Sequence, residues 1–263
     1  MRGLWQAAPI CYQAAMSRPA AIIFDLDDTL IDRPGRVQES WRGALAEIPE
    51  LTARHTVDEV IAVLDRARER AWSDPRRRAG PALDYRGARA AFIEEALSVL
   101  GFSADDGLAK RLNEGISNQI GRTATLNPHA LPILAALQAA KIPLALLTNG
   151  ESRTQRTKIE QFALAPYFAH ILIEEEIGAG KPFDAAYVAA LACFTCPACD
   201  VWFVGDHLEN DIAGPLRHGM RTVWYNPKGH AAPDAAHARA DAEITVLSEV
   251  LDLFDLVTAE TVA

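Results

Sequence analysis

Short apolar runs alternate with longer stretches of helical spacing through most of this chain. The runs occupy residues 20–24, 142–147, 170–173, 200–204 and 221–225. Such short, continuously apolar runs are typical of strands buried on both faces of a sheet. Helices are predicted at residues 128–140, 152–162, 183–191, 210–217 and 247–256. The first has Leu131, Leu134 and Leu137 on one side, and the second has a polar start. Because strands that alternate with helices form βαβ units, this pattern predicts an α/β fold, with a mostly parallel sheet flanked by helices.

One long interval, residues 33–120, contains no strand-like run. It carries four stripes of apolar residues at helical spacing, of which Trp41, Leu45 and Ile48 form the first. The third stripe ends at Gly101, the residue type that most often follows the last turn of a helix. This pattern predicts an inserted all-helical domain. We therefore expect a core domain of residues 17–32 and 121–263, a helical domain of residues 33–120, and a loosely held N-terminal extension of residues 1–16.

The composition is that of an ordinary soluble globular protein, with 49% apolar and 23% charged residues among 263. The net charge of -9 argues against a nucleic acid as the main partner, because phosphate chains bind basic surfaces. No apolar run reaches the ~18 residues that span a bilayer, so we expect no membrane partner. Residues 1–15 mix polar and apolar side chains without periodicity, and we expect the functional start to lie near Met16.

Polar side chains follow three of the predicted strands at the point where each strand ends. They are Asp25 and Asp27, Thr148 and Asn149, and Asp206. The carboxyl ends of parallel strands meet at one edge of a sheet, where ligands of open α/β proteins bind. Lys181 follows a glycine-flanked turn and opens a helix, from which its ammonium can reach the same edge. Each cluster alone is also compatible with a turn or a helix cap, whereas all four together indicate a site.

These residues resemble the four motifs of the haloacid dehalogenase-like hydrolase superfamily. The matching segments are residues 25–29 (DLDDT), 147–150 (LTNG), 180–182 (GKP) and 205–211, and the likeness extends from residue 20 to about residue 225. The resemblance implies a Rossmann-like sheet with a mobile cap. The insertion at 33–120 resembles the helical cap of the phosphoglycolate phosphatase and dehalogenase branch. The short interval between Asn149 and Lys181 leaves no room for the other cap type of the superfamily.

The resemblance also implies a magnesium site. The ligands would be Asp25, Asp206 and a backbone carbonyl near Asp27, with Asp211 outside them, holding a metal-bound water or Lys181. Carboxylate and carbonyl oxygens suit Mg²⁺, which also takes substrate phosphate. A divalent cation of this kind would neutralise both the carboxylates and a phosphate dianion.

The catalytic roles that the resemblance implies belong to the same residues. Asp25 would attack phosphorus to form an aspartyl-phosphate, and Asp27 would protonate the leaving oxygen and later activate water. Thr148, Asn149 and Lys181 would bind the transferring phosphoryl group. The expected enzyme is a Mg²⁺-dependent phosphatase acting on a small phosphorylated metabolite.

Three other functions are compatible with the fold. A phosphomutase would use the same core residues and return the phosphoryl group to a sugar. A dehalogenase is disfavoured, because in that branch the position of Asp27 is not acidic. A non-catalytic binding protein is disfavoured because none of the motif residues is degraded. The sequence leaves a monomer or a homodimer open.

Several residues of the helical interval are candidates for contacts with the leaving group. They are Arg33, Arg36, Trp41, Trp72, Tyr85 and Arg86. For the two tryptophans, packing inside the helical domain is the favoured role. A run of arginines at residues 76–78 has the pattern of a solvated loop.

Three of the four cysteines, Cys193, Cys196 and Cys199, form a CxxCxxC pattern, and the fourth is Cys11. Structural zinc and iron–sulfur sites normally need a fourth ligand, which no neighbouring residue offers. We therefore expect ordinary thiols without a metal, and reduced thiols are typical of a cytoplasmic protein.

Overall fold

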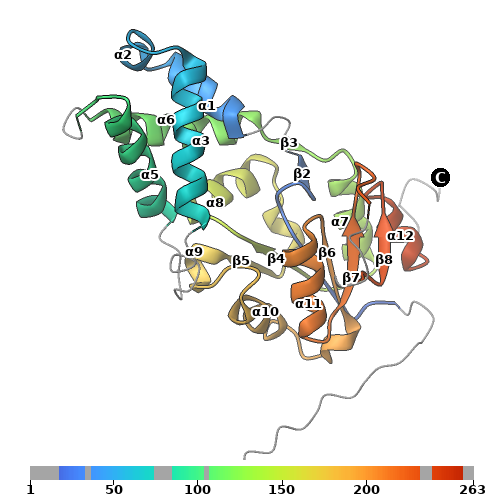
Figure 1. Ribbon diagram of the computed structural model, residues 1–263. Helices are drawn as coiled ribbons and strands as arrows, with labels where there is room; N and C mark the ends of the chain where they lie inside the picture. The colour runs from blue at the N-terminus through green and yellow to red at the C-terminus, as the bar shows by residue number, and fades with distance from the viewer. Residues whose placement is uncertain (1–17, 33–36, 74–84, 104–106, 232–238, 257–263) are drawn as a thin grey trace, which may run out of the picture.

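The core of the protein is a six-stranded, wholly parallel sheet in the order β5-β4-β1-β6-β7-β8 (Figure 1). This is a computed structural model that describes residues 18–32, 37–73, 85–103, 107–231 and 239–256. The strands are β1 (Ala21–Phe24), β4 (Leu144–Thr148), β5 (His170–Ile173), β6 (Val201–Gly205), β7 (Arg221–Tyr225) and β8 (Ala242–Ile244). The predicted α/β fold with a Rossmann-like parallel sheet is therefore confirmed.

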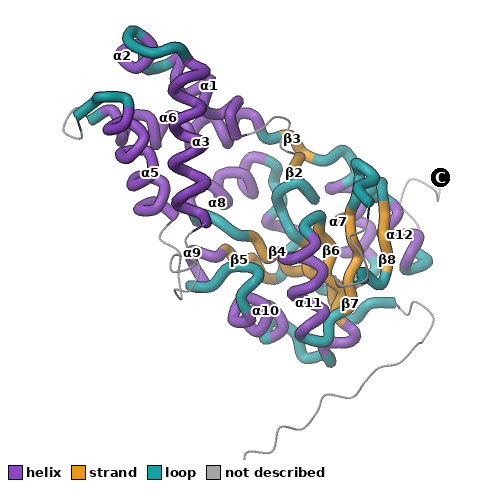
Figure 2. Tube along the Cα trace, in the orientation of Figure 1, coloured by secondary structure: helices purple, strands orange, loops and turns teal. Residues whose placement is uncertain are grey.

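Helices cover both faces of this sheet (Figure 2). They are α7 (Ala130–Ala139), α8 (Ser152–Gln161), α9 (Glu174–Ile177), α10 (Asp184–Leu191), the π-helix η4 (Leu208–Ala213), α11 (Gly214–Arg217) and α12 (Glu249–Leu253). Side chains alternate along β1, so that Ile22 and Phe24 pack with α7 and α12, while Ile23 packs with α10. Because both faces are buried, β1 is apolar throughout, as its sequence indicated.

Strand register brings the polar strand ends together. Phe24 of β1 pairs with Leu146 of β4 and with Val204 of β6. Asp25 is therefore level with Leu147, one residue before the end of β4 at Thr148, and with Gly205, which ends β6. Because β1 lies between β4 and β6, the Asp25 side chain at its end has protein on both sides.

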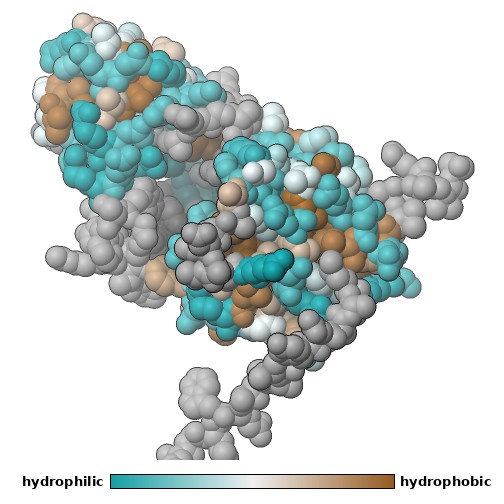
Figure 3. Space-filling view, turned by 45° about the vertical axis from the view of Figure 1, so that its right-hand side comes forward, coloured by the Kyte–Doolittle hydropathy of each residue, from teal (hydrophilic) through white to brown (hydrophobic). Residues whose placement is uncertain are grey.

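The insertion consists of α1 (Val37–Ala46), α2 (Pro49–Thr52), α3 (Val57–Ser73), α5 (Tyr85–Val99) and α6 (Leu108–Thr123). These helices enclose an apolar cluster of their own, in which Trp41 is buried. In the space-filling view the insertion and the core form two lobes (Figure 3). Two short antiparallel strands, β2 (Ile31–Asp32) and β3 (Thr125–Leu126), join the chain entering and leaving the insertion.

Some elements were not predicted from the sequence. Strands β2, β3 and β8 are two or three residues long, too short to show a periodicity of two. The helix expected at residues 210–217 is instead a π-helix followed by the single turn α11. No described helix combines the length and apolar character needed to cross a membrane.

Some expectations concern residues outside the described part of the chain. They include the extension at 1–16, Arg33, Arg36, the arginines at 76–78, and the side chains of Trp72, Tyr85 and Arg86.

Asn127 connects three separate segments next to the β2–β3 pair. It is buried, and its Nδ2 donates to the Thr29 carbonyl at 3.2 Å and to the Tyr225 hydroxyl at 3.0 Å. Its Oδ1 accepts from the backbone N–H of His129 at 3.1 Å. We expect Asn127→Leu to lower the free energy of unfolding by ~1–3 kcal/mol, because it leaves buried partners without hydrogen bonds.

Denaturant unfolding measures this loss. Asn118→Leu, at an exposed position on α6, is the control and should change stability little. Equal unfolding free energies for the two variants would show that the Asn127 hydrogen bonds contribute nothing.

Candidate active site

A single buried ammonium lies between two buried carboxylates at the end of β1. Lys181 Nζ is 2.5 Å from Asp25 Oδ1 and 2.7 Å from Asp211 Oδ1, and all three residues are at most 6% exposed. Buried charges are tolerated when they are paired in this way. Burial alone disfavours the ammonium, yet the carboxylates of Asp211 and Asp25 raise the pKa of Lys181. The lysine is therefore held charged.

The side chain of Asn149 holds the backbone of Lys181. Its Nδ2 donates to the Lys181 carbonyl at 2.6 Å, and its Oδ1 accepts from the Lys181 N–H at 2.8 Å. From its motif position, this side chain was expected to bind the phosphate. In the structure both of its polar atoms bond to the turn that carries the lysine, so the Asn149 side chain positions Lys181.

Glu174 connects this turn to the end of β4. It is buried and accepts a hydrogen bond from the backbone N–H of Gly150 at 3.2 Å. A Cβ placed on Gly180 would lie 2.1 Å from the Glu174 side chain. Glycine at position 180 is therefore required for the two turns to approach each other.

The π-helix η4 presents Asp211 to Lys181 from the opposite side. Asp211 Oδ2 accepts from the backbone N–H of His207 at 3.0 Å, which closes the first turn after β6. A Cβ on Gly205 would lie 2.5 Å from the Asp211 side chain, so this carboxylate needs glycine at the strand end. Short π-helical segments are frequent at functional sites, because the extra residue redirects side chains.

Asp25, Asp206 and Asp211 form an acidic cluster, with one oxygen of each within 4.8 Å of the others. Burial, together with the charges of Asp25 and Asp211, raises the pKa of Asp206 to about 8. Burial is also the main cause that raises the pKa of Asp25 to about 7. The ammonium of Lys181 lowers this pKa only in part, since Asp25 shares it with Asp211. The cluster therefore carries more negative charge than Lys181 neutralises.

These donors fit a hard divalent cation. Mg²⁺ prefers carboxylate and carbonyl oxygens, and a cation here would supply the missing positive charge. The acidic cluster thus contains Asp25 and Asp206, the two side chains that the sequence analysis expected as metal ligands. Asp211 contacts Lys181 directly, which was one of its two expected roles.

Asp27 has partners that the sequence analysis did not identify. Lys158 Nζ lies 2.6 Å and 2.7 Å from its two carboxylate oxygens. Gln155 Nε2 donates to Asp27 Oδ2 at 3.0 Å and to the Thr148 hydroxyl at 2.6 Å. Gln155 and Lys158 are three apart on α8 and lie on its buried face together with Ile159. Because α8 is polar along most of its length, its sequence gives no local signal that singles these two residues out.

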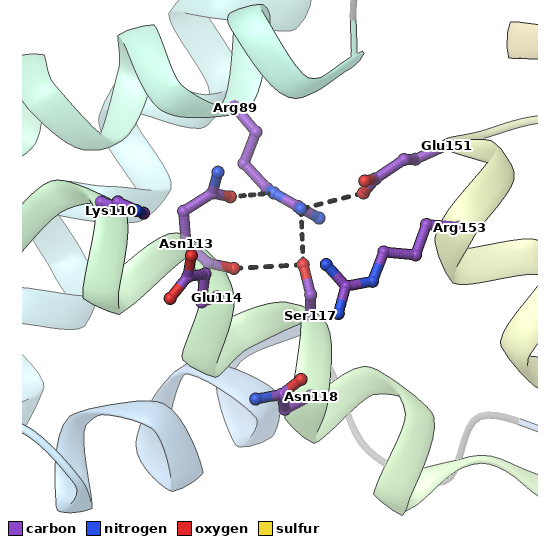
Figure 4. Close-up of a pocket in the computed structure, with 8 residues that line it drawn as sticks. All are labelled: Arg89, Lys110, Asn113, Glu114, Ser117, Asn118, Glu151 and Arg153. Atoms are coloured by element: carbon purple, nitrogen blue, oxygen red, sulfur yellow. Dashed lines mark hydrogen bonds and ion pairs between the residues drawn. The ribbon is translucent and has the colours of Figure 1, made fainter.

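A polar cavity of about 450 Å³ lies between the insertion and the core (Figure 4). Arg89 of α5 crosses it, donating to Ser117 Oγ of α6 at 2.6 Å and to Glu151 Oε2, at the start of α8, at 3.0 Å. Lys110 and Arg153 also line it, and Arg153 points toward Arg89 in the close-up. Because Glu151 follows Thr148 by three residues, the cavity adjoins the end of β4.

A second cavity of about 280 Å³ lies on the other side of the acidic cluster. Its lining includes Asp28, Asp206, Trp224, Lys228 and His230. Asp206 of the acidic cluster is therefore accessible from this cavity.

Cys193, Cys196 and Cys199 lie away from this site, between α10 and β6, and none of them is disulfide-bonded. Burial raises the pKa of the Cys193 and Cys196 thiols. That these thiols bind no metal stays a prediction.

Comparison with known proteins places this geometry in a family context. A family model described as "haloacid dehalogenase-like hydrolase" matches residues 19–219. Ribulose-1,5-bisphosphate 5-phosphatase of Halopiger xanaduensis is 29% identical over 89% of this chain and 98% of its own length. N-acylneuraminate-9-phosphatase of Homo sapiens is 31% identical over 81% of this chain and 85% of its own length.

Solved structures share the fold. A 2-haloacid dehalogenase from Pseudomonas syringae pv. Tomato has a TM-score of 0.66 and 30% identity, covering 89% of this chain and 96% of that one. The HAD-hydrolase YfnB from Bacillus subtilis has a TM-score of 0.70 and 22% identity, covering 91% of this chain and all of that one.

The raised pKa values of Asp25 and Asp206 predict a pH dependence of cation binding. Ionisation of these carboxylates costs more in the folded protein than in the unfolded chain, where the pKa is near 3.8. The metal-free protein should therefore lose stability as the pH rises from about 4 through about 8. Because a divalent cation would bind the ionised carboxylates, the affinity for Mg²⁺ should increase over the upper part of that range.

Calorimetric titration of Mg²⁺ at about pH 6 and about pH 8.5 tests this expectation. Asp206→Asn is the control, because it removes the carboxylate with the most strongly raised pKa and should flatten the pH dependence. Equal Mg²⁺ affinity of the wild type at the two pH values would contradict the electrostatic description of the site.

Proposed function

The chain belongs to the haloacid dehalogenase-like hydrolase family, and on this premise we propose that it is a Mg²⁺-dependent phosphatase acting on a small phosphomonoester. The observation that carries the proposal is the buried Asp25–Lys181–Asp211 arrangement beside Asp206. It combines a nucleophile, a fixed positive charge and candidate ligands for a cation. Relatives named as phosphatases, which match this chain over most of its length, support the same activity.

The metal would be held by Asp25, Asp206 and the backbone carbonyl of Asp27. When bound, Mg²⁺ supplies positive charge that lowers the repulsion between a carboxylate nucleophile and a phosphate dianion. Lys181 adds a second positive charge that is fixed by protein contacts.

In the first half-reaction the Asp25 carboxylate attacks phosphorus, and the bond from phosphorus to the ester oxygen breaks. Lys181 and the Thr148 hydroxyl stabilise the oxygens of the transferring group. Asp27 gives a proton to the departing oxygen, so that the product leaves as an alcohol. Asp25 is then an aspartyl-phosphate.

In the second half-reaction a water molecule attacks phosphorus of the aspartyl-phosphate. Asp27 takes the proton of that water, which restores its own starting state for the next turnover. Inorganic phosphate leaves and Asp25 is regenerated as a carboxylate.

The leaving group would lie between the insertion and the core, and we propose that the insertion acts as a cap over it. The cavity there is lined by the cationic side chains of Arg89, Lys110 and Arg153, by the carboxylates of Glu114 and Glu151, and by amide and hydroxyl groups, which suits a polar leaving group. Closure of such a cap excludes water until the phosphoryl group has moved. Asp27 favours phosphate esters over organohalides, because cleavage of a carbon–halogen bond needs no leaving-group acid.

The direct test is a panel of small phosphomonoesters assayed with Mg²⁺ and after exhaustive chelation. Release of inorganic phosphate that depends on Mg²⁺ is the expected result. Full activity after chelation would contradict the metal dependence, and transfer of the phosphoryl group to a sugar in place of water would indicate a phosphomutase.

Substitutions of Asp25 and of Asp27 should lower the turnover rate in different ways. Asp25→Asn removes the nucleophile and should abolish turnover even of an activated aryl phosphate. Asp27→Asn removes the acid and base, which is typically worth ~10²–10⁴-fold, and the loss should be smaller with a nitrophenyl ester because its leaving group needs no proton. Rates of both variants on nitrophenyl phosphate and on an alkyl phosphate decide the assignment, and equal losses of Asp27→Asn on the two esters would remove its role as the acid.

A further inference from the structure

Lys158 is one of the most deeply buried charged side chains in the described part of the core. It is 2% exposed, and its ammonium contacts both carboxylate oxygens of Asp27, at 2.6 Å and 2.7 Å. Replacing a buried ion pair by apolar side chains is often neutral or stabilising, so stability alone is a weak reason for a lysine at this position. The contact requires another explanation.

Gln155 adds a second fixed contact to the same carboxylate. It is also 2% exposed, and its Nε2 lies 3.0 Å from Asp27 Oδ2 and 2.6 Å from the Thr148 hydroxyl. The one amide group therefore joins the proposed acid and base to the proposed phosphate-binding hydroxyl. With Lys158 on both oxygens and Gln155 on one, the Asp27 carboxylate has little freedom to rotate.

Both side chains come from α8, the helix that begins directly after the Thr148-Asn149-Gly150 turn. A single rigid element thus sets where the phosphate-binding hydroxyl and the Asp27 carboxylate lie relative to each other. A general acid must reach the leaving oxygen to within hydrogen-bonding distance, so an error in the placement of this carboxylate reduces proton transfer before it affects binding.

We propose that Lys158 and Gln155 are positioning residues that hold the Asp27 carboxylate in register with Thr148, so that it can give a proton to the leaving oxygen and later take one from the attacking water. The proposal rests on the phosphatase function given above and deepens it. Both residues contact the Asp27 carboxylate, and each would act through it. Their effect should therefore be confined to the steps in which Asp27 moves a proton.

The test is a double-mutant cycle between Lys158→Met and Asp27→Asn, assayed with an alkyl phosphate and with nitrophenyl phosphate. Lys158→Met should lower kcat on the alkyl phosphate by ~10–100-fold, lower it clearly less on nitrophenyl phosphate, and change KM little on either. In the Asp27→Asn background, Lys158→Met should have almost no further effect on kcat, because the carboxylate that Lys158 holds is already absent.

Two variants serve as matched controls. Lys158→Arg keeps the positive charge and should recover part of the activity that Lys158→Met loses on the alkyl phosphate. Lys141→Met removes a lysine from an exposed position of the core and should leave both rates unchanged. Gln155→Met should reproduce the dependence on the leaving group, and it tests the proposal independently if Lys158→Met does not fold.

Equal losses on the two esters, or losses that multiply in the double variant, would overturn the proposal, because both indicate a general structural effect. The outcome is separable from that of the proposed function. If the wild type releases no phosphate, the phosphatase proposal itself fails. If the wild type and Asp27→Asn behave as expected while Lys158→Met and Gln155→Met match the wild type, only the positioning role is wrong.

Discussion

Three aspartates close together at one buried sheet edge repel one another, and the surrounding structure compensates for that repulsion. Lys181 lies between Asp25 and Asp211, where its ammonium offsets part of the negative charge. The pKa of Asp206 is still raised to about 8 by burial and by the neighbouring carboxylates. A divalent cation would supply the remaining positive charge. The excess of carboxylates that destabilises the metal-free site would therefore hold a cation, and that cation would attract a phosphate dianion.

The backbone around this edge is adapted to that arrangement. Gly180 and Gly205 lie where any Cβ would collide with the carboxylates of Glu174 and Asp211. Asn149 bonds to both the N–H and the carbonyl of Lys181, so the ammonium is held from its backbone as well as from its tip. On the other side, Lys158 and Gln155 provide the equivalent support for Asp27. Asp25, Asp27, Lys181 and Asp211 are thus each held by a partner that comes from a different element.

The sequence predicted the central strands and the residues at their ends, because an apolar run that stops at an aspartate is a local signal. It did not predict β2, β3 or β8, whose two or three residues are too few for a period to be visible. It also did not predict the partners of Asp27. Lys158 lies 131 positions from Asp27, in a helix so polar that its sequence does not show which polar side chains are buried. Motif position also did not show that the Asn149 side chain bonds to the backbone of Lys181. Its contact with phosphate stays a prediction.

Chemical trapping of the intermediate tests the central claim most directly. The wild type is mixed with a phosphomonoester and Mg²⁺, quenched rapidly, and treated with borohydride, which reduces an aspartyl-phosphate to homoserine, and the modified residue is located by peptide mass spectrometry. Homoserine is expected at position 25, in amounts that depend on substrate and on Mg²⁺. Steady turnover with an unmodified Asp25, or modification at a different carboxylate, would contradict it.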